Sequence, residues 1–249
     1  MKNTMRIRYL LSLVFVAAAS WLATAYWFGR EIPDPSIQER TFASSLLGES
    51  RTYFVHLPDS YVRSPTQRYP VIYVLDGTSQ STHTAASAEV MARIGAMPEA
   101  IVIGIPSGEA RNRDYTPPGM RQDSDDANIP DGQADRFLGF LQRELIPRVD
   151  REFRASDMRV LAGNSRGGLF VVHALTTQPA LFDAWIANSP ALWRDDGEMV
   201  KRLQRFLRDT PDARTRLFLS LGGAENAKMT QAYRQALAVL RDEAPRGLQ

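Results

Sequence analysis

Short apolar runs alternate along this chain with longer segments of helical pattern. The apolar or alternating runs are typical of β-strands and occupy residues 52–57, 69–75, 100–105, 158–162, 184–187 and 217–221. Helices are predicted between or after them, at residues 133–153, 166–176, 198–207 and 228–244. This alternation predicts a doubly wound, mostly parallel α/β sheet. Pro147 is expected to kink the first of these helices.

The composition excludes several classes of protein. The chain has 249 residues, of which 44% are hydrophobic and 23% charged, so disorder, collagen and coiled coil are excluded. A net charge of +2 is too small for a nucleic-acid-binding surface. With no cysteine, disulfides, a thiolate nucleophile and Cys-ligated zinc are excluded as well. Only His56, His83 and His173 could supply imidazole, which leaves little for a metal centre.

The N-terminus carries an export pattern. Three basic residues within positions 2–8 precede an uncharged run over residues 9–29, and residues 23–25 form a small-x-small cleavage pattern. A cleaved signal peptide of residues 1–25 and a membrane anchor over residues 9–28 both fit. Either one predicts a periplasmic or extracellular protein. Cleavage would take the net charge from +2 to −1 by removing the three basic residues.

We expect two further regions after this segment. Residues 26–50 are predicted to contain a linker and a first strand region, because residues 31–36 carry two prolines. Residues 51–249 are predicted to form the α/β domain. Within it, the segment 107–132 is long, polar and rich in Asp, Pro and Gly, and a loop of that length is more often functional than not.

A G-x-S-x-G pattern lies between a predicted strand and a predicted helix. Gly163, Ser165 and Gly167 supply its fixed positions. A sharp strand-to-helix turn exposes the serine hydroxyl, and the glycines allow the neighbouring backbone to come close. The helix N-terminus also favours developing negative charge. The pattern predicts Ser165 as a nucleophile, and the alternative is a structural Gly-rich turn.

An oxyanion hole would need two backbone N–H groups near Ser165. Arg166 follows the serine, and Thr78 follows the strand at residues 69–75 through an Asp-Gly pair. We therefore predict the N–H groups of Thr78 and Arg166 as the donors. From the residues alone, a plain strand-ending turn at Thr78 is equally well supported.

Several ordered motifs carry a resemblance to a known family. They are YPVIYVLDG at 69–77, RNRDYTP at 111–117, GGLF after the serine, NSPALW at 188–193 and LFLSLGGAE at 217–225. In this order they resemble the Putative esterase family of α/β-hydrolases, which includes enterochelin esterases and esterase D. The resemblance runs from about residue 51 to the end of the sequence.

The resemblance implies an α/β-hydrolase fold and a Ser–acid–His triad in that chain order. Ser165 carries over as the nucleophile and Glu225 as the acid. The alternative for Glu225 is a carboxylate favoured by the N-terminus of the following helix. Asp195 and Asp196 come too early for this role and are predicted to lie where a helix starts, before Glu198.

The histidine of such a triad has no counterpart after Glu225. The family pattern places it beyond a last strand, so we predict that the last strand and helix are missing and that the sequence is a truncated hydrolase. His173 lies eight residues beyond Ser165, about 12 Å along a helix, and is predicted to pack in the core. His56 is also expected to be structural. His83 could line the pocket and touch substrate.

Other residues are candidates for the pocket wall. Arg111 and Trp193 are predicted to contact substrate, with a surface ion network and a buried aromatic as the respective alternatives. Arg113 and Asp114 could order the same wall or belong to that surface network. The Arg166 side chain is predicted either to face the acyl group or to be exposed to solvent.

The function predicted from these patterns is hydrolysis of a small carboxylic ester through an acyl-enzyme. This chemistry needs no metal or organic cofactor, and a nucleic-acid partner is not expected. A membrane contact is expected only through the N-terminal segment. Two alternatives remain: a relative that binds an ester or siderophore without turnover, and an acyltransferase that uses an alcohol in place of water.

Overall fold

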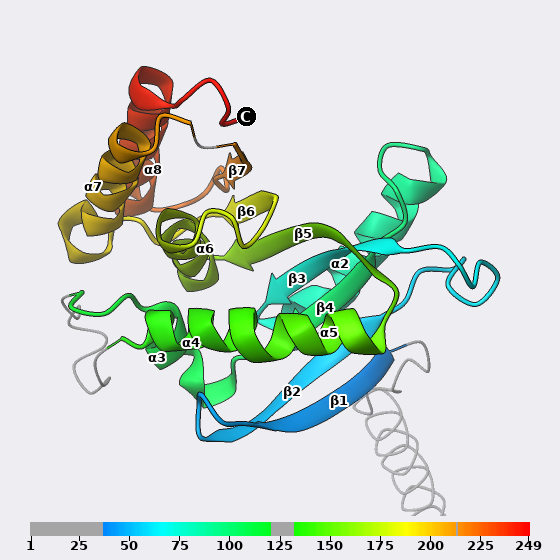
Figure 1. Cartoon of the computed structure of the whole chain (residues 1–249). Coiled ribbons are helices and arrows are strands. Elements are labelled where there is room, and N and C mark those ends of the chain that lie inside the picture. The colour runs from blue at the N-terminus through cyan, green and yellow to red at the C-terminus, as the bar shows by residue number, and fades with distance from the viewer. Residues whose placement is uncertain (1–36, 121–131, 213) are drawn as a thin grey trace, which may run out of the picture. The chain divides into compact units, whose positions relative to one another are not determined.

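A mixed seven-stranded sheet organises the residues that the computed structural model describes, 37–120, 132–212 and 214–249 (Figure 1). The strands are β1 (Ile37–Ser44), β2 (Glu49–His56), β3 (Tyr69–Leu75), β4 (Ile101–Ile105), β5 (Ala155–Asn164), β6 (Ala184–Asn188) and β7 (Arg216–Ser220). Their order across the sheet is β1-β2-β4-β3-β5-β6-β7. Strands β3 to β7 run parallel, and β1 and β2 are antiparallel. The predicted α/β sheet is confirmed.

Helices connect the parallel strands. They are α2 (Gly77–Arg93), α3 (Arg111–Tyr115), α4 (Ala134–Phe140), α5 (Ile146–Glu152), α6 (Arg166–Thr177), α7 (Arg194–Asp209) and α8 (Ala227–Glu243), with a short 3₁₀ turn η1 (Gly108–Ala110). Within the described ranges, no helix combines the length and the apolar character that a membrane crossing requires. The predicted signal peptide or anchor lies outside the described residues.

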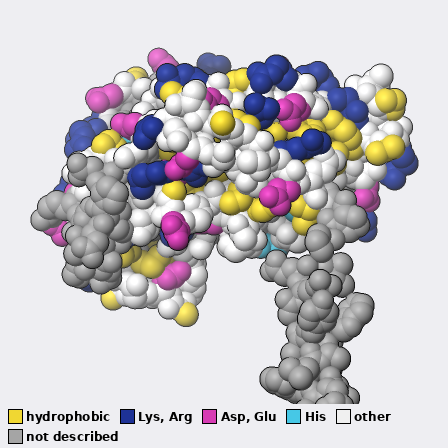
Figure 2. Space-filling model, turned by 90° about the horizontal axis from the view of Figure 1, so that it is seen from below, with side chains coloured by type: hydrophobic (Ala, Val, Ile, Leu, Met, Phe, Trp, Pro, Cys, Tyr) yellow, Lys and Arg dark blue, Asp and Glu magenta, His cyan; other side chains and the backbone are white. Residues whose placement is uncertain are grey.

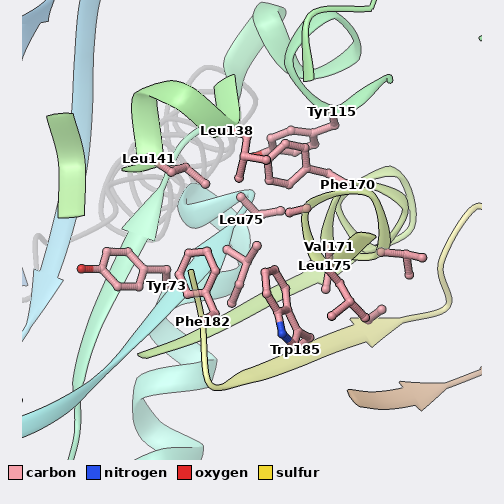
Figure 3. Packing of buried hydrophobic residues seen from close by; sticks show 14 of the residues in the cluster. Tyr73, Leu75, Tyr115, Leu138, Leu141, Phe170, Val171, Leu175, Phe182 and Trp185 are labelled. Carbon is pink, nitrogen blue, oxygen red and sulfur yellow. The ribbon is translucent and has the colours of Figure 1, made fainter. Parts of the chain in front are cut away.

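The two faces of the sheet pack against different helices, as the alternation of side chains in β3 shows. Val71, Tyr73 and Leu75 belong to the large apolar cluster that includes side chains of α4 to α8. Ile72 and Val74 point to the other face, where a smaller cluster contains residues of α2. Figure 3 shows the large cluster, with Tyr73 and Leu75 of β3 near aromatic rings from neighbouring elements. Burial on both faces explains why this strand is apolar throughout.

The predicted helix over residues 133–153 is interrupted near Pro147. A π-helical segment, η3 (Leu141–Leu145), separates α4 from α5. Proline has no N–H and its ring would clash with the carbonyl of Arg143, four residues earlier in the sequence. A wider turn removes that clash, so the predicted kink takes the form of a local π turn.

The start of α7 is left-handed. Asp195, Asp196 and Gly197 have φ values of 48°, 52° and 74°, and regular helix follows from Glu198. The prediction that the two aspartates lie at a helix start before Glu198 is confirmed, although their backbone has the opposite hand. Left-handed backbone costs about 1–2 kcal/mol per non-glycine residue, so this turn is strained.

The outer edge of β7 is partly covered by the last described residues. Leu248 pairs in parallel with Thr215, and the Leu217 N–H donates to the carbonyl of Gln249 over 2.8 Å. The Gln249 N–H donates to the Thr215 carbonyl over 3.1 Å. Residues 247–249 therefore lie beside the first half of β7. Farther along the same strand, Phe218 is 59% exposed.

The surface of the described residues mixes apolar and charged groups. Figure 2 shows one face, on which small groups of apolar side chains lie among Lys, Arg, Asp and Glu. The large exposed apolar side chains include Val62, Val90, Ile94 and Phe218. Single exposed apolar residues are normal for globular proteins and assign no function by themselves.

Candidate active site

Ser165 occupies the sharp turn between β5 and α6. Its backbone has φ 57° and ψ −115°, a region that a non-glycine residue adopts only when the surroundings hold it there. Three hydrogen bonds do so. The Ser165 N–H donates to the Asn188 carbonyl over 2.9 Å, and the Ser165 carbonyl accepts from the N–H groups of Leu169 and Ala191, both over 3.0 Å. The predicted strand–turn–helix context of the serine is confirmed.

Glycines allow the neighbouring backbone to approach this turn. A Cβ atom on Gly163 would lie 2.6 Å from the carbonyl carbon of Gly167, so the turn could not close with a side chain there. A Cβ atom on Gly168 would lie 2.9 Å from Cα of Pro190, in the loop after β6. Because these glycines have no side chain, the start of α6 can pack directly against the backbone of β5 and of the loop after β6.

The loop after β3 begins α2 beside the serine turn. Asp76 is left-handed, with φ 55° and ψ 40°, and precedes Gly77. A Cβ atom on Gly77 would lie 2.4 Å from the backbone nitrogen of Ile105, so this loop lies directly on β4. Thr78 is the second residue of α2 and is exposed. The Asp76 carbonyl accepts from the N–H groups of Ser79 and Gln80 and not from that of Thr78.

The Asp76 side chain does not cap α2, although aspartate at this position often does. Its Oδ1 accepts from the Ser107 hydroxyl and from Nε of Arg111, each over 2.7 Å. Its Oδ2 accepts from Nη2 of Arg111 over 2.9 Å, which makes the ion pair bidentate. The hydrogen bond that Arg111 donates to Asp76 raises the pKa of Arg111. Arg111 Nη2 also lies 3.4 Å from the carbonyl of Asn164, next to Ser165.

Two more residues after Arg111 contact the loops that flank the site. The Asp76 N–H donates to the hydroxyl of buried Tyr115 over 3.2 Å. Arg166 Nη1 donates to the Thr116 hydroxyl over 2.8 Å. The segment 111–116 thus holds the loop after β3 and the turn after β5 together. Figure 3 shows Tyr115 beside Phe170 of α6, consistent with this packing.

These contacts correct one expectation. Arg166 is 7% exposed, so the alternative of a solvent-exposed side chain is wrong. The side chain is directed to Thr116 in the interior because the long segment after β4 folds back over the start of α6. The prediction that the Arg166 N–H lies at the serine turn is unaffected, since that group belongs to the first turn of α6.

Arg113 and Asp114 belong to a largely buried ion cluster with the β1–β2 hairpin. Asp114 is 1% exposed and accepts hydrogen bonds from Arg51 and from Nε of Arg113, the latter over 2.8 Å. Glu49 lies 2.6 Å from both arginines. Hydrogen bonds from Arg113 are the main cause that lowers the pKa of Glu49. The expected alternative of a surface network is therefore wrong as to burial, because the hairpin covers the cluster.

Glu225 lies in the loop between β7 and α8 and is half-buried. Its N–H donates to the Gly222 carbonyl over 3.2 Å, and the Gly222 N–H donates to the Ser189 hydroxyl over 3.1 Å. The Ser189 N–H in turn donates to the Ser220 carbonyl over 2.8 Å. A series of contacts therefore runs from this loop to the loop after β6, and from there to Ser165 through Asn188.

Trp193 is half-buried and packs against the large apolar cluster. Its ring has cationic groups near it, with the Arg194 guanidinium carbon 5.4 Å and Lys228 Nζ 5.6 Å from its centroid. Lys228 is the second residue of α8, the helix that follows Glu225. Trp193 thus lies beside the α8 end of the candidate site, and its predicted contact with substrate stays a prediction.

The three histidines lie in different surroundings. Nε2 of His173 is 2.8 Å from Asp135 Oδ1, and burial lowers the pKa of this imidazole despite the carboxylate. Nε2 of His56 is 3.1 Å from the hydroxyl of Ser81. Both are buried, which confirms the expectation of structural roles. His83 is exposed on α2, five residues after Thr78, and its predicted substrate contact stays a prediction.

Together these residues provide a half-buried serine at a sharp turn, backbone amides in the first turns of two helices, and a carboxylate on the loop after β7. The sequence matches a family model: the model described as Putative esterase covers residues 44–245. The chain belongs to this esterase family. The match includes the serine turn, the loop after β3 and the loop that carries Glu225.

Relatives of this chain have names that state an activity. Ferri-bacillibactin esterase BesA of Bacillus subtilis is 30% identical over 189 residues, which are 70% of this chain and 64% of that protein. Siderophore triacetylfusarinine C esterase of Aspergillus fumigatus is 33% identical over 138 residues, or 50% of this chain and 44% of that protein. This chain thus spans between 44% and 64% of the length of these two relatives.

A solved structure gives the same picture of the fold. The IroE-like serine hydrolase from Shewanella oneidensis superposes with a TM-score of 0.72 at 30% identity, covering 85% of this chain and 71% of that one. The likeness supports the α/β-hydrolase fold of this chain.

Sequence patterns do not reveal the residues that join the two halves of the candidate site. These residues are Asp76, which the sequence places only within a turn, Ser107 and Tyr115. Their contacts span 31 to 39 residues in sequence, so no local pattern reveals them. The sequence does contain one signal. Aspartate often caps a helix N-terminus, so Asp76, directly before a helix, is a residue whose side chain is expected to accept hydrogen bonds.

Proposed function

We propose that this chain hydrolyses carboxylic esters through an acyl-enzyme on Ser165. The observation that carries the proposal is the backbone of Ser165, held at φ 57° and ψ −115° between a strand and a helix N-terminus. Strained backbone at such a position is commonly part of a functional site. In the first step Ser165 Oγ bonds to the ester carbonyl carbon and its proton passes to a base. The alcohol then leaves with a proton, and water releases the acid.

In this proposal the N–H groups of Thr78 and Arg166 stabilise the oxyanion. Both belong to the first turns of helices, whose amides have no acceptor within the helix. The N-terminal ends of α2 and α6 also carry partial positive charge. Two such ends meeting at Ser165 favour the negative charge that develops on the carbonyl oxygen.

Glu225 is proposed as the acid that orients a histidine base. Its loop is connected to the serine turn through the loop after β6. The two buried histidines already contact Ser81 and Asp135, and His83 is exposed on α2. The proposal requires an imidazole between Ser165 and Glu225, and the contacts of His56 and His173 hold these two side chains elsewhere. Without one, a relative that binds the ester and does not turn it over is the second candidate.

Siderophore-like esters are the proposed substrate class. One relative described above is named a ferri-bacillibactin esterase and the other a siderophore triacetylfusarinine C esterase, and these names support the proposal. We also propose that the protein is exported, on the basis of the basic, apolar and small-x-small pattern at its N-terminus. Fractionation of cells that express the full chain tests the location.

Covalent labelling is the first test of the mechanism. With free imidazole added as the base, we expect a fluorophosphonate to modify Ser165 in the folded chain and to leave Ser165→Ala unmodified. Ser87→Ala is the matched control, since Ser87 is exposed on α2 and outside the site. Labelling that persists in Ser165→Ala, or that is absent from the wild type, contradicts the proposed nucleophile.

Free imidazole separates turnover from binding alone. If the serine and the oxyanion donors are assembled, imidazole should accelerate hydrolysis of p-nitrophenyl butyrate by the wild type beyond the rate with Ser165→Ala. Glu225→Gln should reduce this imidazole-dependent rate. Binding of a siderophore ester with no imidazole-dependent rate would favour the non-catalytic candidate. Added glycerol that yields a transesterified product would favour acyl transfer.

A further inference from the structure

The bidentate ion pair between Asp76 and Arg111 places a carboxylate close to the proposed oxyanion donors. Asp76 immediately precedes α2, whose second residue is Thr78. The same carboxylate lies near the start of α6, because a Cβ atom on Gly167 would be 3.4 Å from Asp76 Oδ2. A negative charge in this place would oppose the formation of an oxyanion at the ends of both helices.

The direction of the Asp76 carboxylate is unusual for a residue before a helix. An aspartate there commonly accepts from the N–H of the second or third helical residue, here Thr78 or Ser79. The Asp76 carboxylate accepts instead from Ser107 and Arg111. The Ser79 N–H is bonded to the Asp76 carbonyl, so the Thr78 N–H is the amide that the carboxylate would otherwise reach.

Arg111 is well placed to hold the carboxylate in this direction. Its guanidinium donates through Nε and Nη2 to both carboxylate oxygens, and Nη2 also approaches the carbonyl of Asn164. The guanidinium carbon of Arg111 also lies 5.8 Å from the centroid of the Tyr115 ring. The arginine thus contacts the loop after β3 and the residue before the nucleophile at once.

We infer that Arg111 is a positioning residue that neutralises the Asp76 carboxylate and keeps it away from the Thr78 N–H. The inference rests on the proposed function, because it concerns the oxyanion donors of that reaction. It differs from the sequence-based expectation that Arg111 contacts substrate. Arg111 acts here through Asp76 and does not touch the ester.

The test compares three variants in the imidazole-dependent hydrolysis of p-nitrophenyl butyrate. Arg111→Met should lower kcat about 100-fold with little change in KM, the loss that follows removal of one oxyanion donor. Asp76→Asn combined with Arg111→Met should recover most of that loss, because the uncompensated charge is gone. Asparagine also tolerates the left-handed backbone of this position. Arg111→Lys should fall between the wild type and Arg111→Met.

Matched controls come from an exposed ion pair. Arg241 and Asp242 are paired on α8, and Arg241→Met and Asp242→Asn should leave both constants unchanged. If Arg111→Met raises KM, and the double variant with Asp76→Asn does not recover the lost kcat, Arg111 binds substrate and the inference is overturned. A purely structural role of Arg111 would lower stability in Arg111→Met and in Arg111→Lys, and adding Asp76→Asn to Arg111→Met would not restore kcat.

Hydrogen exchange at the Thr78 amide gives a readout that does not depend on activity. Followed by NMR in the full chain, this amide should exchange at least tenfold more slowly in Arg111→Met than in the wild type. The reason is that the released carboxylate would accept from it. Unchanged exchange overturns the inference whatever the esterase assay shows. A wild type that neither labels nor hydrolyses refutes the proposed function, and the exchange measurement then decides the role of Arg111 alone.

Discussion

The loops on the two sides of Ser165 differ in how firmly the rest of the fold holds them. The loop after β3 lies against β4, and its Asp76 is bonded to Ser107, Arg111 and Tyr115. The loop after β7 carries Glu225, is largely exposed and is connected mainly through Ser189. Ser165 and the proposed oxyanion donors are therefore held in place by contacts between loops of the fold. The proposed acid depends on a strand near the edge of the sheet.

Glycine substitutions should reveal this difference most strongly. Gly77→Ala places a methyl group 2.4 Å from a backbone nitrogen of β4, so the loop after β3 must move. We expect the rate of Ser165 labelling by a fluorophosphonate to fall about 100-fold, as for small misplacements of catalytic groups. Overpacking should lower the free energy of unfolding by about 1–3 kcal/mol.

Gly223→Ala is the matched substitution in the loop after β7. No atom lies within 4 Å of the added methyl group, and we expect the free energy of unfolding to change by less than about 0.5 kcal/mol. Equal losses of labelling in the two variants would show that the two loops are held alike.

Substitution in the ion cluster of Glu49, Arg51, Arg113 and Asp114 should give the next largest effect. Asp114→Ala removes a carboxylate that is 1% exposed and leaves Arg51 and Arg113 without that partner. Breaking a buried pair in this way costs about 3–5 kcal/mol of unfolding free energy, measurable by urea denaturation. Asp242→Ala, which breaks an exposed pair on α8, should leave the denaturation midpoint unchanged. A small effect of Asp114→Ala would mean that the cluster does not support the site.

A smaller effect is expected from the titration of His173 in α6. Burial lowers the pKa of this imidazole, outweighing Asp135, and Arg202 also lowers it. The unfolded chain therefore binds a proton more readily than the folded one as the pH falls through the ordinary histidine range, and stability falls with it. Between pH 7.5 and 5.5 the wild type should lose more unfolding free energy than His173→Asn. Equal pH dependence in the two proteins would contradict this.

The open part of the β7 edge should affect association more than stability. Phe218 is 59% exposed on this strand, and an exposed apolar edge strand favours pairing between molecules. Phe218→Lys should reduce self-association in light scattering while the free energy of unfolding changes by less than about 0.5 kcal/mol. Val62→Lys, at an exposed residue outside the strands, is the control. The same reduction in both variants would point to general solubility.

Strands buried on both faces were predictable from the sequence. The boundaries of β3 match those expected, and β4 and β6 differ by one residue. The helix α2 was not predicted, because only three of its residues, Gly77, Ser81 and Ala88, are buried and its Ala, Ser and Thr residues show no clear apolar stripe. The helix α3 was hidden within a long polar segment for the same reason.

The candidate site was predictable only where one motif contains it. The serine turn follows from glycines two residues on either side of Ser165, a spacing that local backbone geometry requires. The ion pair of Asp76 with Arg111 joins residues 35 apart, and the bond of Arg166 to Thr116 joins residues 50 apart. Such contacts depend on how loops from different strands meet at one edge of the sheet. No periodicity in the sequence records that.

The strand order also has a consequence for how the chain is made. From β3 the order continues through β5, β6 and β7, so each of these strands joins the edge that the preceding one exposes. Chains emerge from the ribosome N-terminus first, at about 5–20 residues per second. The loop after β3 and Arg111, which follows β4, are therefore synthesised before Ser165, and Ser165 before Glu225. Growth of the sheet in the direction of translation assembles the site from its most firmly held side to its least.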